Sequence, residues 1–462
     1  MTLTVAVIGG GISGLAAAYY LGQAGAAVTV LEKTPRIGGH LRVSELAGVP
    51  VDEGAESLLN RRPEAVTLAR EVGLSDDIVY PAPAGAAIWS RGRMHSLPTG
   101  TVMGVPSDPG TLEGLLTSQE IERVRAEAGR PGMPLSGDTG IGQLVTERLG
   151  PAVTERLVEP LLAGVYAGRA DNLSLRATVP ALAAAAQRET SLLDAAAAVI
   201  SQNDQGSVPV FAGIRGGVGR LAGAVAGASG AQIRTGVTVR AIQRGSDGRF
   251  HVETGPVSRP EFVAVDGVVV AVPPVAAARL VRDVTPVAGS LLAAVEQASV
   301  AIVTLAFRRS AFPAPPTTSG FLVPPAEGLT IKAVTFSSVK WPWLAEMADD
   351  LIVLRASVGR FGDVADLQRP DDELVGAVLR DLEQVLGVRG TPVESRVTRW
   401  GGALPQYAVG HAERMQAVQD AIRAVPGLAV CGAVYDGVGM AACVAGARLA
   451  AEQVATGLGS VV

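Results

Sequence analysis

A glycine-rich turn near the N-terminus constrains the fold more than any other part of the sequence. Residues 3–8 (LTVAVI) have the composition of a buried parallel strand, and a helix is predicted from about Ser13 to Ala24. The turn between them contains Gly9, Gly10, Gly11, Ile12, Ser13 and Gly14, which satisfy the pattern G-x-G-x-x-G. Its three glycines allow a tight turn, the approach of a pyrophosphate, and close packing of the helix on the sheet. The helix N-terminus then offers free amides and partial positive charge to phosphate groups.

An acidic residue follows at the distance that a nucleotide site requires. Residues 27–32 (AVTVLE) predict a second strand, so the segment forms a βαβ unit that ends in Glu32. A carboxylate at this strand end accepts hydrogen bonds from ribose hydroxyls, and it would repel the 2′-phosphate of NADP. We therefore predict a dinucleotide site here. The alternative is that the glycines only shape a turn in an ordinary α/β fold.

Composition sets the limits on fold and partners. The chain has 462 residues, which indicates two or three interlocked domains. Hydrophobic residues make up 48% and the net charge is −5, so we expect a globular protein without a basic field for nucleic acid. With two cysteines, Cys431 and Cys443, and four histidines without metal-ligand spacing, neither a disulfide framework nor a metal site is predicted. We see no signal peptide and no run of about 18 apolar residues, so we expect no transmembrane segment and a cytoplasmic location.

The remaining periodicities divide the chain into a helical and a sheet region. The patterns predict, in order, helices over 109–129 and 138–202, strands over 233–242 and 263–272, an antiparallel sheet over 298–361, a helix over 371–386, a strand over 393–399 and a long helix over 440–457. We expect the N-terminal βαβ unit and the C-terminal strand and helix to form one domain, with the other segments inserted between them.

The segment after Glu32 resembles that of a class of flavoproteins. Residues 33–40 (KTPRIGGH) are similar to the R-x-G-G-R extension of the glutathione-reductase-like flavoproteins, in the branch of the amine and porphyrinogen oxidases, and His40 stands where that family usually has Arg or Lys. Residues 51–57 (VDEGAES) resemble the family loop beside the isoalloxazine ring. The resemblance implies FAD, with contacts at Lys33, Gly38, Gly39, His40, Leu41, Gly54, Ala55, Glu56 and Ser57. Glu56 is also compatible with a solvated loop acid.

Two later segments resemble the remaining flavin contacts of the same family. Residues 237–242 match the strand whose backbone meets the adenine, and we place that contact at Val239. Residues 430–440 (VCGAVYDGVGM) resemble the second flavin motif, which directs the N-terminus of helix 440–457 at the flavin. The resemblance implies further cofactor contacts at Trp400, Val438, Gly439 and Met440. We interpret Cys431 and Cys443 as packing residues.

Three internal segments point to the substrate class. Residues 159–180 (EPLLAGVYAGRADNLSLRATVP) closely resemble a stretch of the protoporphyrinogen and coproporphyrinogen oxidases that amine oxidases lack. Residues 213–221 resemble that family's turn before the adenine strand, and residues 334–342 with 399–411 resemble its soluble Gram-positive type. On these motifs the chain is identified as a member of the FAD-dependent porphyrinogen oxidase family.

Membership in that family implies a reaction. It is the oxidation of coproporphyrinogen III to coproporphyrin III in haem biosynthesis, with six electrons removed in three FAD cycles, dioxygen as acceptor and hydrogen peroxide as by-product. Protoporphyrinogen IX is the alternative substrate, and a ferrochelatase is the implied receiver of the product. The protein's task is then to stack and orient the macrocycle, so we expect no catalytic side chain.

The resemblance also implies the architecture. The expected fold class is α/β, with a glutathione-reductase-like, Rossmann-type FAD-binding domain, an inserted helical lobe and an antiparallel-sheet substrate domain of the amine oxidase type. We assign residues 1–57, 205–275 and 395–462 to the FAD-binding domain, 99–204 to the helical lobe, and 58–98 with 276–394 to the substrate-binding domain. The lobe is either an ordinary helical unit or an apolar wall that touches a membrane.

The substrate contacts and the rival functions remain open. Candidate partners for the propionates are Arg91, Arg93 and Lys340, each also compatible with a plain surface charge, and Tyr407 is a further candidate substrate contact. The nearest rival enzyme is a flavin amine oxidase, which needs an aromatic cage that only Tyr407 and Trp400 could form. A rival without catalysis is a flavin-free carrier with a dinucleotide fold.

Overall fold

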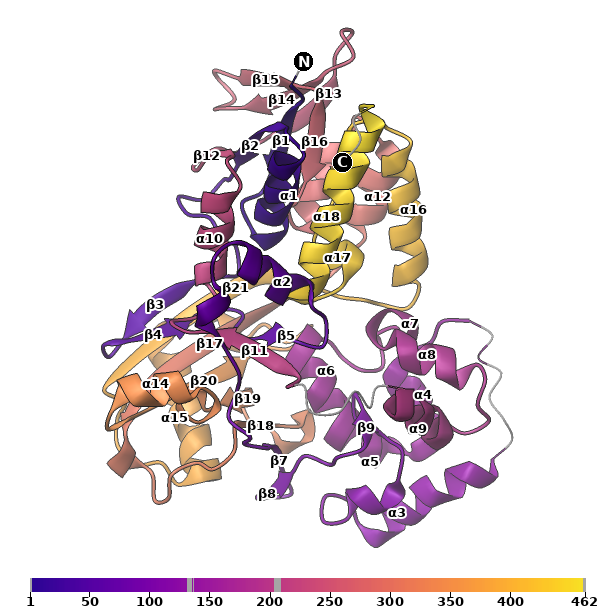
Figure 1. Cartoon of the computed structure of the whole chain (residues 1–462). Coiled ribbons are helices and arrows are strands. Elements are labelled where there is room, and N and C mark those ends of the chain that lie inside the picture. The colour runs from indigo at the N-terminus through magenta and orange to yellow at the C-terminus, as the bar shows by residue number, and fades with distance from the viewer. Residues whose placement is uncertain (1, 131–134, 136, 203–208, 460–462) are drawn as a thin grey trace.

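The computed structural model describes residues 2–130, 135, 137–202 and 209–459, and Figure 1 shows their arrangement. One region is built on a parallel sheet whose described strands lie in the order β12 (Gln232–Arg234), β2 (Ala27–Leu31), β1 (Thr4–Ile8), β16 (Gly267–Val270) and β22 (Leu428–Val430). β1 pairs in parallel with both β2 and β16. Segments more than 400 residues apart in the sequence therefore share one sheet.

Helices cover both faces of this sheet because its central strands are apolar on both sides. One face carries α1 (Ile12–Gln23), α2 (Glu64–Glu71), α10 (Arg220–Ala228) and α18 (Met440–Gly457). The other face carries α11 (Pro274–Val281), α12 (Pro286–Ala293) and α16 (His411–Arg423). α1 and α18 pack against each other, so the N-terminal and C-terminal helices form one layer (Figure 1).

A second, larger sheet forms the lower part of the molecule in Figure 1. Its described strands lie in the order β21 (Glu394–Pro405), β17 (Gln297–Arg308), β20 (Leu351–Val358), β19 (Ile331–Thr335), β18 (Gly320–Leu322), β7 (Ala86–Ser90) and β8 (Arg93–Ser96). The pairs are antiparallel except for β18 with β7. α15 (Asp371–Leu386) packs on the face that carries Leu354 and Ala356, so Arg355 and Ser357 point to the opposite face.

Helices make up the third region. It contains α3 (Ser118–Arg125), α4 (Ile141–Leu149), α5 (Pro151–Val153), α6 (Glu159–Tyr166), α7 (Leu175–Thr178), α8 (Pro180–Ala186) and α9 (Leu192–Gln202). A buried ion pair connects α4 with the segments that follow α3 and precede α9. Arg148 Nε of α4 donates to Glu127 at 2.7 Å, and Glu127 also accepts from Ser191 Oγ at 2.7 Å. Of these helices, α6 packs against β18 and β19 of the large sheet.

Smaller elements connect these regions. The antiparallel pieces are β3 (Val43–Leu46), β4 (Val49–Asp52), β5 (Leu58–Leu59), β6 (Ile78–Val79), β9 (Thr101–Val102), β10 (Val105–Pro106), β11 (Phe211–Ile214), β13 (Ala241–Arg244), β14 (Phe250–Thr254) and β15 (Glu261–Val265). The short helices are α13 (Ser337–Lys340), α14 (Pro342–Ala348) and α17 (Ala433–Asp436). β3 and β4 form a hairpin that leads from the parallel sheet toward the large sheet (Figure 1).

The expected α/β architecture is found, with a parallel-sheet region, an inserted helical region and a mainly antiparallel sheet, and most of the predicted elements are present. The helices predicted over 371–386 and 440–457 have these bounds in the structure. The strand predicted over 233–242 is wrong in its middle, because the chain turns at Gly236 (φ +70°) between β12 and β13. The strand predicted over 263–272 is divided at Asp266, whose carboxylate accepts from the backbone and hydroxyl of Thr4 at 2.9 and 2.6 Å.

The domain boundaries stay a prediction. The boundary between residues 204 and 205 lies outside the described residues, as do Met1 and 460–462.

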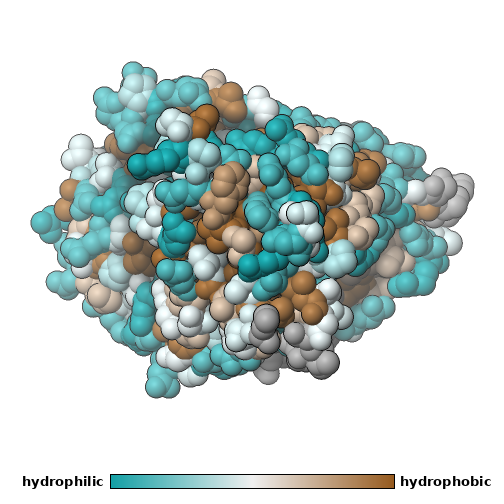
Figure 2. Space-filling model, turned by 90° about the horizontal axis from the view of Figure 1, so that it is seen from above, coloured by the Kyte–Doolittle hydropathy of each residue, from teal (hydrophilic) through white to brown (hydrophobic). Residues whose placement is uncertain are grey.

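Within the described chain, none of the helices combines the length and the hydropathy that crossing a bilayer requires. Seen from the end that carries the parallel sheet, the surface shows small apolar groups separated by hydrophilic residues (Figure 2).

Candidate functional site

The turn between β1 and α1 forms a backbone cradle. Gly9 has φ +108°, and a Cβ there would lie 2.4 Å from the carbonyl oxygen of Ala271. A Cβ on Gly14 would lie 1.9 Å from the carbonyl oxygen of Gly9, so α1 could not pack this closely with any larger residue. The nearest atom to a Cβ on Gly11 is 4.0 Å away, on Gly39. Two glycines thus bring helix and strand together, while the third leaves space above the helix N-terminus.

That helix N-terminus is available to an anion. No described side chain caps α1, and its first turn contains no acidic residue. Glu32 stands beside it at the end of β2, where Oε2 accepts from the backbone N–H of Gly10 at 2.7 Å and Oε1 from that of Thr34 at 2.8 Å. These bonds fix the carboxylate, and each oxygen keeps acceptor capacity for a ribose hydroxyl. The arrangement fits the diphosphate and ribose of a dinucleotide.

The second glycine pair lies against the first. Gly38 pairs with Gly11 in an isolated β-bridge, and its N–H donates to Gly10 O at 2.7 Å. Arg36, which we had not selected from the sequence, holds this loop, because its guanidinium donates to Gly39 O at 2.8 Å and Ile37 O at 3.2 Å. The N–H of the buried Leu41 donates to Gly38 O at 2.9 Å.

His40 and Trp400 connect that loop to the next one. Their rings lie edge to face with centroids 5.2 Å apart, and Trp400 Nε1 donates to Glu53 O at 2.8 Å. Burial, together with the nearby Arg36 charge, lowers the pKa of His40, so the imidazole is neutral near pH 7. A Cβ on Gly54 would lie 1.9 Å from His40 O, so the 51–57 loop crosses directly over the 33–41 segment.

Three of the predicted residues meet in a buried ionic cluster. Glu56 accepts from Ser337 Oγ at 2.6 Å and forms ion pairs with Arg355 at 3.2 Å and Lys340 at 3.5 Å. Lys340 Nζ also donates to Ser57 Oγ at 2.7 Å. Burial alone would raise the pKa of Glu56, but the Lys340 and Arg355 charges outweigh it and lower that pKa to about 2.

Arg355 links the same cluster to the loop backbone, where it donates to Gly54 O. Sequence reasoning missed this residue, although a lone arginine in the apolar run of β20 was a signal for it. Glu56 is thus a paired buried acid and not a solvated loop residue. Lys340, which we predicted for the substrate, is paired with the predicted flavin loop, and its role toward the substrate stays a prediction.

The C-terminal turn approaches α1 from the other side. The thiol of the buried Cys431 lies 3.8 Å from Ser13 O, and α18 begins at Met440 after Gly439 (φ +131°). No described side chain caps α18, and its first turn contains no acidic residue. A second uncapped helix N-terminus, at Val438, Gly439 and Met440, therefore joins the first helix near the glycine cradle.

Tyr407 and His411 form hydrogen bonds to the backbone of the C-terminal turn. Tyr407 is 3% exposed, its hydroxyl donates to Ala433 O, and its ring stacks on His411 at 4.2 Å. His411 Nε2 bonds Val434 O at 2.9 Å. His411 was not among the predicted residues, and only the family motif that contains it pointed to it. The predicted substrate contact of Tyr407 is untested and stays a prediction.

The other predicted residues lie further from the cradle. Arg91 pairs with Glu120 at 2.7 Å, and Arg93 Nη2 donates to Gly114 O at 2.9 Å, so both face the helical region. Val239 is buried in the core beneath the parallel sheet, two residues after Val237, whose N–H donates to Glu32 O. Lys33 is exposed and Ala55 is half-buried. These assignments also stay predictions.

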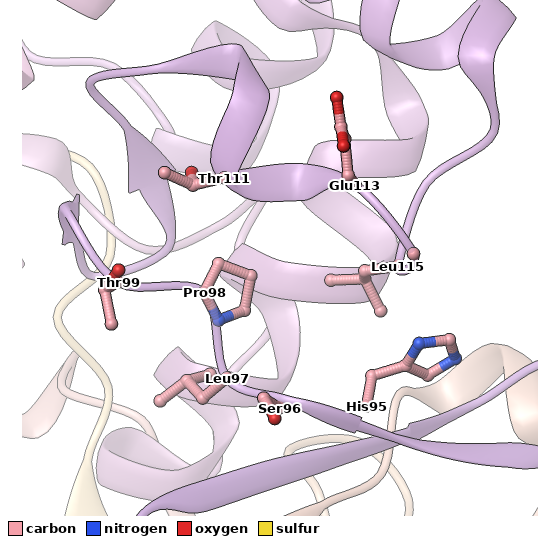
Figure 3. Close-up of a pocket in the computed structure, with 9 residues that line it drawn as sticks. His95, Ser96, Leu97, Pro98, Thr99, Thr111, Glu113 and Leu115 are labelled. Carbon is pink, nitrogen blue, oxygen red and sulfur yellow. The ribbon is translucent and has the colours of Figure 1, made fainter.

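A surface hollow of about 450 Å³ lies between the segments 95–99 and 111–115 (Figure 3). Its lining residues are His95, Ser96, Leu97, Pro98, Thr99, Thr111, Glu113, Gly114 and Leu115. No predicted cofactor residue lines it, so it is distinct from the cradle. Among the described residues, no group of three or more His, Cys, Asp or Glu side chains could hold a metal ion.

The chain is similar to known flavoenzymes over nearly its whole length. Residues 12–455 match the family described as flavin containing amine oxidoreductase. The coproporphyrinogen III oxidase of Mycobacterium tuberculosis is 39% identical over 457 residues, which cover 97% of this chain and 96% of that protein. The coproporphyrinogen III oxidase of Bacillus subtilis is 30% identical and covers 95% of each chain.

A solved structure is also similar to this chain over nearly its whole length. A protein from Exiguobacterium sp. 255-15, provisionally described as a protoporphyrinogen oxidase, superposes with a TM-score of 0.86 at 32% identity, covering 98% of this chain and 99% of that one. The cofactor of this chain is FAD, for which the two uncapped helix N-termini, Glu32 and the open face of Gly11 form a fitting set of contacts. The chain therefore belongs to the flavin-containing amine oxidoreductases, in the branch that contains the bacterial coproporphyrinogen III oxidases.

Proposed function

We propose that this protein oxidises coproporphyrinogen III to coproporphyrin III in haem biosynthesis. The observation that carries the proposal is its similarity, over 95–97% of its length, to coproporphyrinogen III oxidases from different bacteria. The reaction removes six electrons in three cycles, and in each cycle dioxygen takes two electrons and two protons to form hydrogen peroxide. FAD, when bound, supplies the hydride acceptor.

The chain's own residues bind and orient the cofactor and the substrate, and no side chain takes part in the reaction itself. The N-termini of α1 and α18, which have no described acid in the first turn, would direct backbone amides at negative charge on the bound cofactor. The Glu56, Lys340 and Arg355 cluster fixes the loop that runs beside the flavin, because each charge there is paired. Ser337 and Arg355, which bind Glu56, are both buried, so this anchor of the loop is shielded from bulk water.

The placement of the aromatic residues disfavours the amine oxidase alternative. An amine substrate requires aromatic faces that are free to contact it. Tyr407 stacks on His411 and donates to Ala433 O, and Trp400 packs on His40 and donates to Glu53 O. Protoporphyrinogen IX remains the second candidate, since the similar Exiguobacterium structure is provisionally described by that substrate.

Parallel assays test the proposal. The purified yellow protein is incubated in air with coproporphyrinogen III or protoporphyrinogen IX, and porphyrin fluorescence and peroxide are followed. We expect faster porphyrin formation from coproporphyrinogen III, with three peroxides per porphyrin. Equal rates would remove the preference, and peroxide formed only with added amines would favour the amine oxidase reading.

We further propose a cytoplasmic location and transfer of the product to a ferrochelatase. Both described cysteines are free and buried, as is common in a reducing compartment. The product is a metal-free porphyrin, which a metal-inserting enzyme must next receive. Co-purification of a ferrochelatase with the tagged protein, and its loss on mixing with excess untagged protein, would test the transfer.

A further inference from the structure

Two large apolar side chains are left uncovered on the small sheet that β5, β11 and β6 form. Leu59 of β5 lies opposite Phe211 of β11 in the strand register, and the two are 39% and 44% exposed. Val210, which precedes Phe211, is also exposed. Single apolar residues are common on protein surfaces, whereas neighbouring ones mark a contact with another molecule. We call Leu59 and Phe211 the uncovered pair.

The neighbouring positions of the small sheet are covered. On one face, Leu58 and Ala212 are fully buried in the core of the parallel-sheet region. Gly213 lies two residues after Phe211 and therefore on the opposite face, the one that carries the uncovered pair. A Cβ on Gly213 would lie 2.7 Å from the ring of Trp341, which is itself buried. The uncovered pair thus lies where the cover provided by Trp341 ends.

Lys340 places a positive charge beside the uncovered pair. Its Nζ lies 5.8 Å from the centre of the Phe211 ring and 5.1 Å from that of Trp341, and its side chain is half-buried. The described chain gives this ammonium two polar partners, Ser57 Oγ at 2.7 Å and Glu56 at 3.5 Å. An ammonium has three N–H donors, so one of them is left for a further acceptor. An apolar surface with a cationic donor at its side fits a ligand that combines an apolar ring with a carboxylate.

The uncovered pair is continuous with the loop that we predict to run beside the flavin. Ser57, which accepts from Lys340, is the last residue of the 51–57 loop. Leu59 follows it after one residue, which is about 7 Å along an extended chain. Phe211 is paired with Leu59, so both side chains and the Lys340 ammonium border one end of this loop.

We propose that Leu59 and Phe211 bind one edge of the porphyrinogen ring and that Lys340 receives one of its carboxylate arms. The inference rests on the proposed function for the identity of the substrate, a macrocycle with an apolar ring system and four carboxylates. Contact with the ring removes the exposed apolar area of the pair from water, which favours binding in proportion to that area. The carboxylate takes the third N–H of Lys340, and Glu56 and Ser57 keep theirs.

Substitution of Phe211 tests the apolar contact. Phe211→Thr removes the ring and keeps a residue that favours strands. The matched control is Phe262→Thr, which removes another exposed phenylalanine, from the edge strand β15. For FAD-loaded Phe211→Thr we expect the Kd of coproporphyrin III, measured by porphyrin fluorescence, to rise by roughly fivefold or more. KM should rise similarly with a smaller change in kcat, whereas FAD content and Tm should stay at the parent's values.

Substitution of Lys340 tests the ionic contact. In Lys340→Gln the side-chain amide can still donate to Ser57, but the charge is lost. The Kd of coproporphyrin III should rise, and it should depend less on salt concentration than in the parent, because salt screens the ion pair that has been removed. Phe211→Thr should keep the salt dependence of the parent. The two variants thus separate the apolar from the ionic contribution.

The controls separate a binding role from a structural one. Phe262→Thr should match the parent in Kd and KM. An unchanged Kd and KM in Phe211→Thr would overturn the inference and leave the uncovered pair to a protein partner. A raised Kd together with loss of FAD or a lower Tm would overturn it as well, since that marks a structural residue. Because Kd is measured without turnover, a parent protein that binds coproporphyrin but oxidises no porphyrinogen would refute the proposed function while still testing the uncovered pair.

Discussion

Glu56, in the 51–57 loop, holds a buried negative charge against Lys340 and Arg355. Its pKa lies below the ordinary 4.5, at about 2, because the attraction of the two cations exceeds the opposing effect of burial. A carboxyl with a lower pKa in the folded state stabilises the fold fully above the unfolded pKa. That contribution, about 3 kcal/mol, is lost as the pH falls from 4.5 toward 2.

Replacing Glu56 should lower the stability of the folded protein. Glu56→Gln should lower the free energy of unfolding at pH 7 by about 3 kcal/mol, because two buried cations lose their partner. It should also flatten the acid limb of the stability curve below pH 4.5. Urea unfolding at pH 7, 5 and 4 measures both effects. Glu413→Gln, which removes an exposed pair with Arg176, should cost less than about 1 kcal/mol, and equal slopes for Glu56→Gln and the parent would refute the assignment.

At the scale of elements, the contact of α1 with β1 depends on Gly14. Gly14→Ala places a Cβ 1.9 Å from Gly9 O, so α1 must move away from the cradle. We expect a protein that purifies with little or no FAD, measured by the ratio of absorbance at 450 nm to that at 280 nm, a band position set by the flavin itself. Gly223→Ala in α10 is the matched control, since its Cβ would meet nothing within 4 Å. It should keep its FAD and gain up to about 1 kcal/mol of stability.

The helical region depends on one buried acid. Glu127 accepts from Arg148, Ser191 and the N–H of Leu192, and so joins α4 to the start of α9. Glu127→Ala should therefore lower the free energy of unfolding by about 3–5 kcal/mol, because Arg148 loses the carboxylate that it binds. The FAD content should change little, since the cradle lies elsewhere. Denaturant unfolding followed by tryptophan fluorescence, with FAD release recorded in parallel, checks both statements.

At the scale of the whole molecule, the proposed FAD site combines α1 with α18, which are far apart in the sequence. A ligand that binds only the folded state stabilises it by about 2.7 kcal/mol at a hundred times its Kd. Removal of FAD should therefore lower the Tm, and added FAD should restore it in a concentration-dependent way. A Tm that does not depend on FAD would contradict a cofactor held between α1 and α18.

Local patterns predicted the parts of this molecule that local physics determines. The cradle and Glu32 follow from glycine spacing within one βαβ unit, and α15 and α18 follow from helical periodicity. The pairing of Lys340 with Ser57 and of Arg355 with Gly54 joins residues 283 and 301 positions apart, which no spacing reveals. Gly236 and Asp266 divided two predicted strands, because a turn and a hydrogen bond to β1 outweighed β propensity.

The order of strands in the parallel sheet has a consequence for synthesis of the protein. β1 is made before its neighbour β16, which follows more than 250 residues later in the sequence, and β22 and α18 follow later still. The earliest strand must therefore wait, apolar on both faces, while the inserted regions are made. If FAD binds between α1 and α18, we expect a nascent chain to retain its flavin only after α18 has emerged, so that cofactor loading reports on assembly of the parallel-sheet region.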